Sequence, residues 1–593
     1  MFFKILRNMR IAVALGVFML ITAQFLDMYH ELPRAYYMHN PTHTQFVPSL
    51  LKMLGTGAVA ATSAFVVFGV FALVFGRAYC SFFCAFGIFM DIISRAARAV
   101  LSTRIFNAKP AKNFARKLFS RKYRKPRTAL RAIFLLAAVA CITFGWSALL
   151  GFVDPYSLYG KIFGSAIRPA AALAFDSANN LAYDLGIYSV EPLEGDPRVA
   201  ISAFGAALAI LTAISLASIA RGRLFCNTLC PVGAWLGLLA KFSLFKLSLD
   251  TKKCVSCGLC ERNCKAECID SKNKSLDFSR CVLCLDCAAN CPKRAIKITP
   301  NRLYLPTSKK DANKKSEIQS PTSPARFATS RPDTPTAHSP LDFKIPRRAF
   351  AATAGGLAAT LCAAAKRDSL PAKPDTATSA TNAANISPYT VGGDRPDKRL
   401  TAPPGSKSIE NFLEKCTGCQ ICTAACKAQI LKPSTGEWGL SHIFQPYMDY
   451  AEGFCLFDCH SCSKACPTGA IEFITRKQKH SIKIGTAIFD ENLCVVKLDM
   501  TDCAACAEHC PVQAIETVPF GDRKNHLYIP KVHPEVCIGC GACESICPSR
   551  PHRAIVVEGL STHIRAKKFD DSMRFHTPTQ TPAESSPQSP FPF

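Results

Sequence analysis

The sequence predicts a multidomain protein with an α-helical four-span membrane bundle, an α+β two-cluster ferredoxin domain and an α+β four-cluster polyferredoxin domain. The 593-residue chain contains 31 cysteines, nearly all in runs spaced like the ligands of iron–sulfur clusters. Four apolar stretches are each about 20 residues long, the length of helix that crosses a bilayer. Segments rich in Ser, Thr and Pro separate the cysteine-rich parts, as linkers do.

Residues 1–245 are expected to form the membrane domain. The predicted spans cover residues 11–28, 58–75, 132–153 and 199–220. Residues 95–131 hold thirteen Lys and Arg and no acid, so the positive-inside rule places this loop in the cytoplasm. Residues 154–198 hold six acids against three bases and are expected to form an outward loop. The net charge of +28 is thus unevenly placed, and a positive-inside loop explains its most basic stretch more simply than nucleic-acid binding, so we expect no nucleic-acid partner.

A short motif occurs twice in the membrane domain, after the second and the fourth span. Both copies fit the pattern Gly-Arg-x-(Tyr/Phe)-Cys-x3-Cys-x2-Gly, over residues 76–87 and 222–233. The four thiols at this cytoplasmic edge belong to Cys80, Cys84, Cys226 and Cys230. They could hold a cluster or a metal ion, pair as disulfides, or have a structural role alone. The repeat is too regular for chance, but neither copy is a complete ligand run.

Residues 246–300 are expected to form a cytoplasmic ferredoxin domain with two [4Fe–4S] clusters. Both cysteine runs have the spacing C-x2-C-x2-C-x3-C, with ligands Cys254, Cys257, Cys260 and Cys264, then Cys281, Cys284, Cys287 and Cys291. In two-cluster ferredoxins the fourth cysteine of each run ligates the other cluster, so we expect Cys264 and Cys291 to be exchanged. Zinc would need only four thiolates in two knuckles. Cys141 and Cys268 fit no run and are expected to be packing residues.

Residues 401–567 are expected to form a larger domain with four [4Fe–4S] clusters, which brings the total to about six. Its ligands are Cys416, Cys419, Cys422 and Cys426; Cys455, Cys459, Cys462 and Cys466; Cys494, Cys503, Cys506 and Cys510; Cys537, Cys540, Cys543 and Cys547. The sequence leaves open which run lends its fourth cysteine to which neighbour. Cys459-His460 ends a C-x3-C-H pattern close to that of haem attachment, but a cluster ligand cannot also bind haem covalently.

An export signal is predicted between the two cysteine-rich domains. Residues 346–366 contain Arg347-Arg348 before a weakly apolar stretch, which resembles a twin-arginine signal. A domain that receives its clusters in the cytoplasm must be exported folded, which makes the twin-arginine translocase a coherent partner. If the arginine pair is a chance feature, residues 401–593 stay in the cytoplasm. The predicted linkers and disordered tail are residues 301–345, 367–400 and 568–593.

On these motifs, residues 1–300 resemble the NapH/MauN ferredoxin-type membrane proteins, which have four helices, two C-x3-C(P) motifs and a two-cluster domain. Residues 346–560 resemble the NapG/MauM ferredoxin-type proteins, which begin with a twin-arginine signal and carry four cluster motifs. The chain looks like the two joined head to tail. The resemblance implies quinol oxidation and electron delivery to periplasmic reductases or maturation systems. Two residues depart from the family pattern, since Ala85 and Lys427 stand where a proline is expected.

The expected protein spans the bacterial inner membrane several times and takes electrons from the quinone pool or a cytoplasmic donor. Its acceptor would be a periplasmic reductase or cytochrome. A quinol site is hypothesised after the first span, at Tyr29, His30 and Glu31, because His can accept the quinol proton. Ordinary interfacial residues would give the same pattern, so quinol dehydrogenase activity stays open. The alternatives are a maturation factor that keeps a partner's metal centre reduced and an all-cytoplasmic ferredoxin hub.

Overall fold

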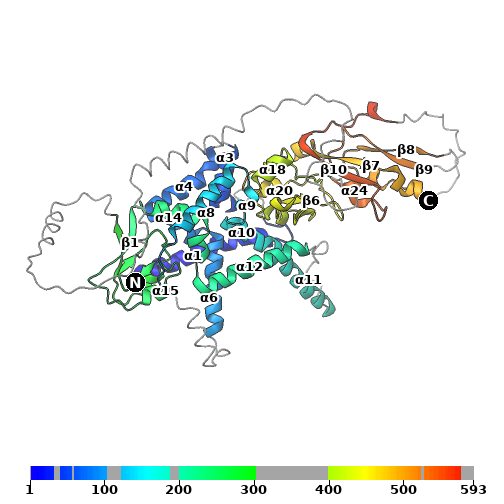
Figure 1. Ribbon diagram of the computed structural model, residues 1–593. Helices are drawn as coiled ribbons and strands as arrows, with labels where there is room; N and C mark the ends of the chain where they lie inside the picture. The colour runs from blue at the N-terminus through cyan, green and yellow to red at the C-terminus, as the bar shows by residue number, and fades with distance from the viewer. Residues whose placement is uncertain are drawn as a thin grey trace, which may run out of the picture. The chain divides into compact units, whose positions relative to one another are not determined.

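The computed structural model describes residues 2–32, 41–56, 59–102, 122–186, 200–301, 399–521 and 527–575. The chain divides into two compact units. The first comprises Met1–Gly16, Lys52–Phe144 and Ser215–Thr376, and the second comprises Val17–Leu51, Gly145–Ile214 and Ala377–Phe593. The division falls inside helices α1 (Phe2–Leu26) and α12 (Ile201–Arg221), so each unit contains one end of both helices (Figure 1).

Two helices in the described part of the chain are long and apolar enough to cross a membrane, α1 with 25 residues and α12 with 21. The other two predicted spans form shorter helices, α4 (Val59–Phe75) and α8 (Thr128–Thr143). The span expected over 132–153 ends early because Gly145 adopts a left-handed φ of 75° just after the helix, a common helix stop. The four-span bundle therefore stays a prediction.

Residues 154–198, expected to form a loop, are largely helical where the structure describes them. α10 (Pro155–Ile162) begins at Asp154, whose carboxylate accepts the backbone N–H of Ser157 at 2.7 Å. A π-helical turn, η3 (Phe163–Ile167), continues into α11 (Arg168–Asp184). An N-cap Asp followed by Pro at the first helical position is a strong helix start. The sequence contains this signal, but counting charges does not detect it.

The first unit contains both copies of the duplicated motif. Each copy forms a short helix and then a longer one: α5 (Tyr79–Phe82) with α6 (Ala85–Ser102), and α13 (Leu224–Thr228) with α14 (Pro231–Ala240). α14 packs against both α4 and α8. The repeat in sequence is thus a repeat in structure.

Residues 245–300 form a small α+β domain of the first unit. β1 (Phe245–Leu249) pairs antiparallel with β4 (Ile296–Pro300), so the two ends of the domain lie side by side. Between them lie α15 (Leu259–Asn263), β2 (Ile269–Asp270), β3 (Ser275–Leu276) and α16 (Asp286–Ala289). The buried apolar core is small, and cysteines make up a large part of it.

A buried ionic network joins the duplicated motif to this small domain. Arg223 donates to both carboxylate oxygens of Asp91, at 3.1 and 2.8 Å, and Lys265 lies 3.0 Å from the same carboxylate. Lys265 also pairs with Asp286 at 3.2 Å. Burial would raise the pKa of Asp91, but Arg223 and Lys265 hold it below its usual value. Neutralising Asp91 would leave two buried cations poorly compensated.

The second unit contains a larger α+β domain built from antiparallel strand pairs. β7 (Ile482–Phe489) pairs with β10 (Ile555–Arg565), β8 (Ile515–Phe520) with β9 (Leu527–Val532), and β5 (Leu431–Pro433) with β6 (Pro446–Met448). The helices of this domain are α18 (Ile409–Lys415), α19 (Ile421–Ala424), η5 (Leu440–His442), α20 (Ser461–Ala465), α21 (Arg476–Lys479), η6 (Glu491–Leu493), α22 (Val495–Leu498), α23 (Ala505–Glu508), α24 (Ala542–Ile546) and η7 (Asp571–Met573). Elsewhere the unit has η1 (Pro41–Thr44), α9 (Ser147–Leu150) and part of α3 (Phe46–Thr56).

His563 should make the stability of this domain depend on pH. Its ring, on β10, has no hydrogen-bond partner at either nitrogen, and burial lowers its pKa from 6.5 to about 4. Between pH 6.5 and about pH 4, His563 binds a proton more readily in the unfolded chain than in the folded one. The folded domain therefore loses stability as the pH falls through this range, by about 1.4 kcal/mol for each unit of pKa difference.

We predict that His563→Leu removes this part of the acid sensitivity. The measurement is the denaturant midpoint of the wild-type and variant chains at about pH 7 and about pH 5. Both proteins contain the same cysteine runs, so any loss of clusters in acid should lower both denaturant midpoints by the same amount. An equal fall in midpoint for both chains would contradict the prediction.

Candidate metal centres

The structure gathers the eight predicted ligands of the small domain into two groups. One group lines a single pocket and consists of Cys254, Cys257, Cys260 and Cys291. The other surrounds the buried thiol of Cys287 and adds Cys284, Cys281 and Cys264. Burial, and then these neighbouring thiols, raise the pKa of Cys287, as expected where thiols are crowded together. Each group contains the fourth cysteine of the other run, which is the predicted exchange.

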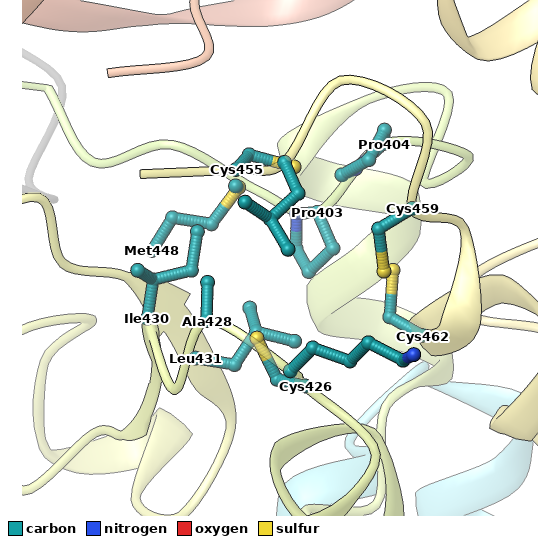
Figure 2. Close-up of a pocket in the computed structure, with 12 residues that line it drawn as sticks. Pro403, Pro404, Cys426, Ala428, Ile430, Leu431, Met448, Cys455, Cys459 and Cys462 are labelled. Atoms are coloured by element: carbon teal, nitrogen blue, oxygen red, sulfur yellow. The ribbon is translucent and has the colours of Figure 1, made fainter. Parts of the chain in front are cut away.

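The sixteen predicted ligands of the larger domain form four groups. The first surrounds Cys422 and adds Cys416, Cys419 and Cys466. The second lines the pocket shown in Figure 2, with Cys426, Cys455, Cys459 and Cys462. The third lines another pocket, with Cys494, Cys503, Cys506 and Cys547. The fourth surrounds Cys543 and adds Cys537, Cys540 and Cys510. The first and second runs thus exchange their fourth cysteines, as do the third and fourth.

These groups suit [4Fe–4S] clusters. Every cysteine in the described ranges is a free thiol. Within those ranges no three His, Cys, Asp or Glu side chains converge on a single metal ion, whereas the thiolates of a four-iron cluster stand apart at its corners. Backbone N–H groups donate to the sulfurs of Cys291, Cys466 and Cys510 at 3.3, 3.4 and 3.2 Å. Such bonds stabilise thiolate charge and tune cluster potentials.

A left-handed residue after the second cysteine shapes four of the runs. It starts the short helix that holds the third cysteine, with φ of 72°, 63°, 61° and 82° at Gly258, Leu285, Gln420 and Gly541. Residues other than Gly are uncommon in this conformation, so Leu285 and Gln420 hold strained backbone beside predicted ligands. A hydrogen bond that the Gln420 side chain accepts from Thr423 at 3.0 Å offsets part of the backbone strain at Gln420.

The first run of the larger domain lies against residues 147–168, which we call the docking segment. Ser157 Oγ donates to Thr417 Oγ1 at 2.9 Å, and Arg168 donates to the carbonyl of Ala424 at 2.7 Å. At the start of the docking segment, α9 packs against α18, and Figure 1 shows the two labels close together. The contact also includes the ring pair of Phe152 and Phe444, 6.2 Å between centroids, and brings backbone close to backbone.

Two glycines make this close approach possible. A Cβ atom at Gly160 would collide with the carbonyl oxygen of Cys419, and one at Gly151 with that of Thr417. Any larger residue at either position must therefore push the cysteine loop away. The sequence offers no signal for this role, because it depends on a contact between segments far apart in the chain.

A buried lysine lies beside the same cysteine run. Lys161 Nζ donates to the carbonyl of Gly151 at 3.0 Å and stands 3.8 Å from the ring centroid of Phe152. Burial lowers the pKa of Lys161 to about 7, while Asp154 and the thiols of the first run favour the charged form. Charge close to a cluster is one of the factors that set its reduction potential.

The predicted quinol site also lies close to the first run, directly after α1. It comprises Tyr29, His30 and Glu31. Arg168, which donates to Ala424, also donates to the carbonyl of Phe25 at 3.1 Å and so links the end of α1 to the run. Burial, and then the charge of Arg168, lower the pKa of His30 to about 4. The imidazole is therefore neutral near pH 7 and releases readily any proton that it takes up.

The remaining sequence-predicted residues fall into three cases. Cys268 is buried in the core of the small domain, with its sulfur 3.5 Å from that of Cys264, and Cys141 lies half-buried on α8. The four thiols of the duplicated motif are all buried in the first unit. The predicted signal at residues 346–366 lies outside the described residues.

Three protein families match parts of the chain. One described as a 4Fe-4S binding domain matches residues 56–126 and 203–250. Two described as 4Fe-4S dicluster domains match residues 415–471 and 501–550. The dicluster matches span the first two and most of the last two cysteine runs of the larger domain. The chain therefore contains several [4Fe–4S] ferredoxin domains.

Relatives of this chain include other ferredoxin-type proteins. The ferredoxin-type protein NapF of Escherichia coli K12 is 30% identical over 161 residues, which are 27% of this chain and 86% of NapF. The methylamine utilization ferredoxin-type protein MauM of Methylorubrum extorquens is 28% identical over 27% of this chain and 74% of MauM. The uncharacterised protein MJ0749 of Methanocaldococcus jannaschii is 33% identical over 23% of this chain, which spans 56% of that protein. No solved structure matches.

We predict that Gly160→Val weakens docking of the first run, since overpacking of this kind typically costs about 1–3 kcal/mol. A protease site inserted between residues 301 and 399 allows the chain to be cut while folded. After cutting, the wild-type C-terminal domain should stay with the N-terminal part of the chain, and that of Gly160→Val should separate. Gly205→Val is the matched control, because a Cβ there meets nothing within 4 Å. Equal retention in all three chains would rule out the role of Gly160.

Proposed function

Because this chain belongs to the family of ferredoxin-type [4Fe–4S] proteins that includes NapF, we propose that it carries electrons from membrane quinol to a redox partner outside the bacterial inner membrane. Iron–sulfur electron transfer follows from the family. The donor, the sidedness and the partner are our proposal. Each bound cluster would supply one-electron chemistry, and the protein would position the clusters and set their potentials.

The observation that carries the proposal is the position of Arg168. Its guanidinium donates to the carbonyls of Phe25 and Asp27, at 3.1 and 3.4 Å, and to that of Ala424 at 2.7 Å. It thus spans from the predicted quinol site to the first cysteine run. A quinol that loses its electrons at this point would deliver them to the nearest cluster of the chain.

The residues around His30 supply the proton chemistry that this step needs. Oxidation of one quinol to quinone releases two electrons and two protons. His30 would take up the first proton transiently, because its lowered pKa favours release, and the exposed carboxylate of Glu31 offers both protons a route to water. The two electrons would leave one after the other, since each cluster accepts one. Lys161 and Arg168 place positive charge at the receiving end, which favours electron arrival.

The order of the four groups supports one direction of flow through the larger domain. Exchange of fourth cysteines joins the first group to the second and the third to the fourth. The N–H of Cys455 donates to the carbonyl of Cys540 at 2.9 Å, which brings the second group next to the fourth. Electrons entering at the first group would therefore leave from the third, which contains Cys494 and Cys503.

Opposite sides of the membrane are proposed for the two cysteine domains. The docking segment that holds the larger domain overlaps the acid-rich stretch at residues 154–198. At the end of the basic loop, Arg131 lies 3.4 Å from Ser279 of the small domain. By the positive-inside rule these stretches face opposite compartments. We propose a NapH/MauN-type part fused to a NapG/MauM-type part, with residues 346–366 as the twin-arginine signal and six clusters in the two cysteine-rich domains.

We predict that His30→Ala abolishes quinol-dependent cluster reduction in membranes, with the rate falling about 100-fold or more because the proton acceptor is lost. The rate is followed by the bleaching of cluster absorbance after a quinol is added. Reduction by dithionite should be unchanged, which shows that the clusters remain. His552→Ala, an exposed histidine, is the matched control. Quinol reduction at the wild-type rate in His30→Ala would remove the quinol site from the proposal.

We predict that a reporter fused after Phe593 is located outside the cytoplasm. Alkaline phosphatase at this position should be active, and it should lose activity when Arg347 and Arg348 are both replaced by Lys. The paired-lysine chain keeps the positive charge and so controls for a general effect of the basic linker. Activity that survives the replacement would contradict the signal, and an inactive fusion to the wild-type chain would favour the all-cytoplasmic hub.

A further inference from the structure

The four thiols of the duplicated motif face one another inside the first unit. Cys80, Cys84, Cys226 and Cys230 are 5, 4, 3 and 5% exposed. The thiol of Cys230 is buried and lies within electrostatic reach of the other three, which raise its pKa beyond the effect of burial. Two cysteines from each copy thus meet at one place in the bundle.

Two arginines cross between the copies in the same way. Arg77 of the first copy donates to the carbonyl of Cys226 at 2.9 Å, and Arg223 of the second donates to the carbonyl of Cys80. The closing glycines leave room for them, since a Cβ at Gly87 would come within 3.2 Å of the Arg223 guanidinium. The sequence repeat therefore folds as two related halves around the four thiols.

The second cysteine of each copy lies at a helix N-terminus. Cys230 Sγ accepts the N–H of Gly233 at 3.3 Å at the start of α14, and the N–H of Gly87 interacts with Cys84 at the start of α6. Such N–H bonds stabilise a thiolate. Ser, Thr, Asp and Asn cap helices better than Cys does, so capping alone does not explain a cysteine at both positions.

The charge around the thiols points to an anion held among them. Arg77 is fully buried, and it donates hydrogen bonds to neutral acceptors, the side chain of Asn227 and backbone carbonyls. Its Nε is buried without a hydrogen-bond partner. A buried guanidinium normally faces a negative partner. A cluster held by four thiolates carries net negative charge and would supply it.

We propose that Cys80, Cys84, Cys226 and Cys230 bind an additional [4Fe–4S] cluster at the cytoplasmic edge of the membrane domain. The 4Fe-4S binding family matches residues 56–126 and 203–250, which contain these four cysteines and no others. Binding of this cluster does not depend on the proposed function.

A relay role for the site does rest on the proposed function. Arg223, which lies at the site, also contacts the small domain. Its backbone N–H donates to the carbonyl of Lys265 at 3.1 Å. Lys265 follows Cys264, a ligand of the second group in that domain. The site would gain one electron as that group loses one, with no proton transferred.

The test compares Cys84→Ser/Cys230→Ser with the wild-type full chain purified in detergent. Serine keeps both helix caps, so the substitution removes two ligands with little change to the fold. We expect the variant to lose about four iron atoms and four sulfides per chain and the matching EPR intensity of the reduced protein. Cys141→Ser, on α8 and outside every group, should retain the full iron content. Unchanged iron in the double variant would overturn the proposal.

A single Cys84→Ser variant keeps the test valid if the double variant does not fold. Three thiolates would remain, so we expect oxidation to give the EPR signal of a three-iron cluster. Equimolar zinc in the wild-type chain, or disulfides among these cysteines by mass spectrometry, would also overturn the proposal. Quinol-dependent reduction of the exported clusters should persist in Cys84→Ser. The failure of this site is therefore distinguishable from the failure of the quinol pathway.

Discussion

Exchange of the fourth cysteine between neighbouring runs is the constraint on which the rest of the structure depends. Three cysteines of a run lie on one loop and short helix, and the fourth follows the end of that helix and reaches the adjacent group. Each pair of runs is thereby joined through two shared groups of cysteines. The helices between the ligands have only four or five residues and the sheets only two strands. Such small elements bury little apolar surface, so metal binding and folding must be closely coupled.

Both units also contain buried cationic side chains. In the first unit Arg223 and Lys265 share the carboxylate of Asp91. In the second, Lys161 donates to a backbone carbonyl and lies over the rings of Phe152 and Phe444, near the first cysteine run. Charges taken out of water destabilise a protein unless a partner compensates them. Their repeated occurrence beside thiols is consistent with the negative charge that thiolate-bound clusters bring into the interior.

The sequence predicts those parts of the protein that depend on local spacing. The regular runs indicate the cysteines to be grouped and, for Cys264 and Cys291, the exchange between them. The sequence does not reveal that Cys466 joins the first group. The runs that begin at Cys455 and Cys494 are irregularly spaced, so the spacing does not show which two runs exchange their fourth cysteines. The helix after Asp154 escapes a count of charges, although Asp154-Pro155 signals it. The contact between Gly160 and the loop of Cys419 is beyond any local pattern, since it joins residues far apart in the chain.

The docking segment has a consequence for the joining of the two halves in one polypeptide. Ser157 and Thr417 are separated by 260 positions, and the contact between their segments combines hydrogen bonds, close backbone approaches and the Phe152–Phe444 ring pair. Two separate chains would have to meet by diffusion before these contacts could form. A covalent connection turns that encounter into an intramolecular one, which raises the effective concentration of each segment around the other. The contact can then re-form quickly each time it opens.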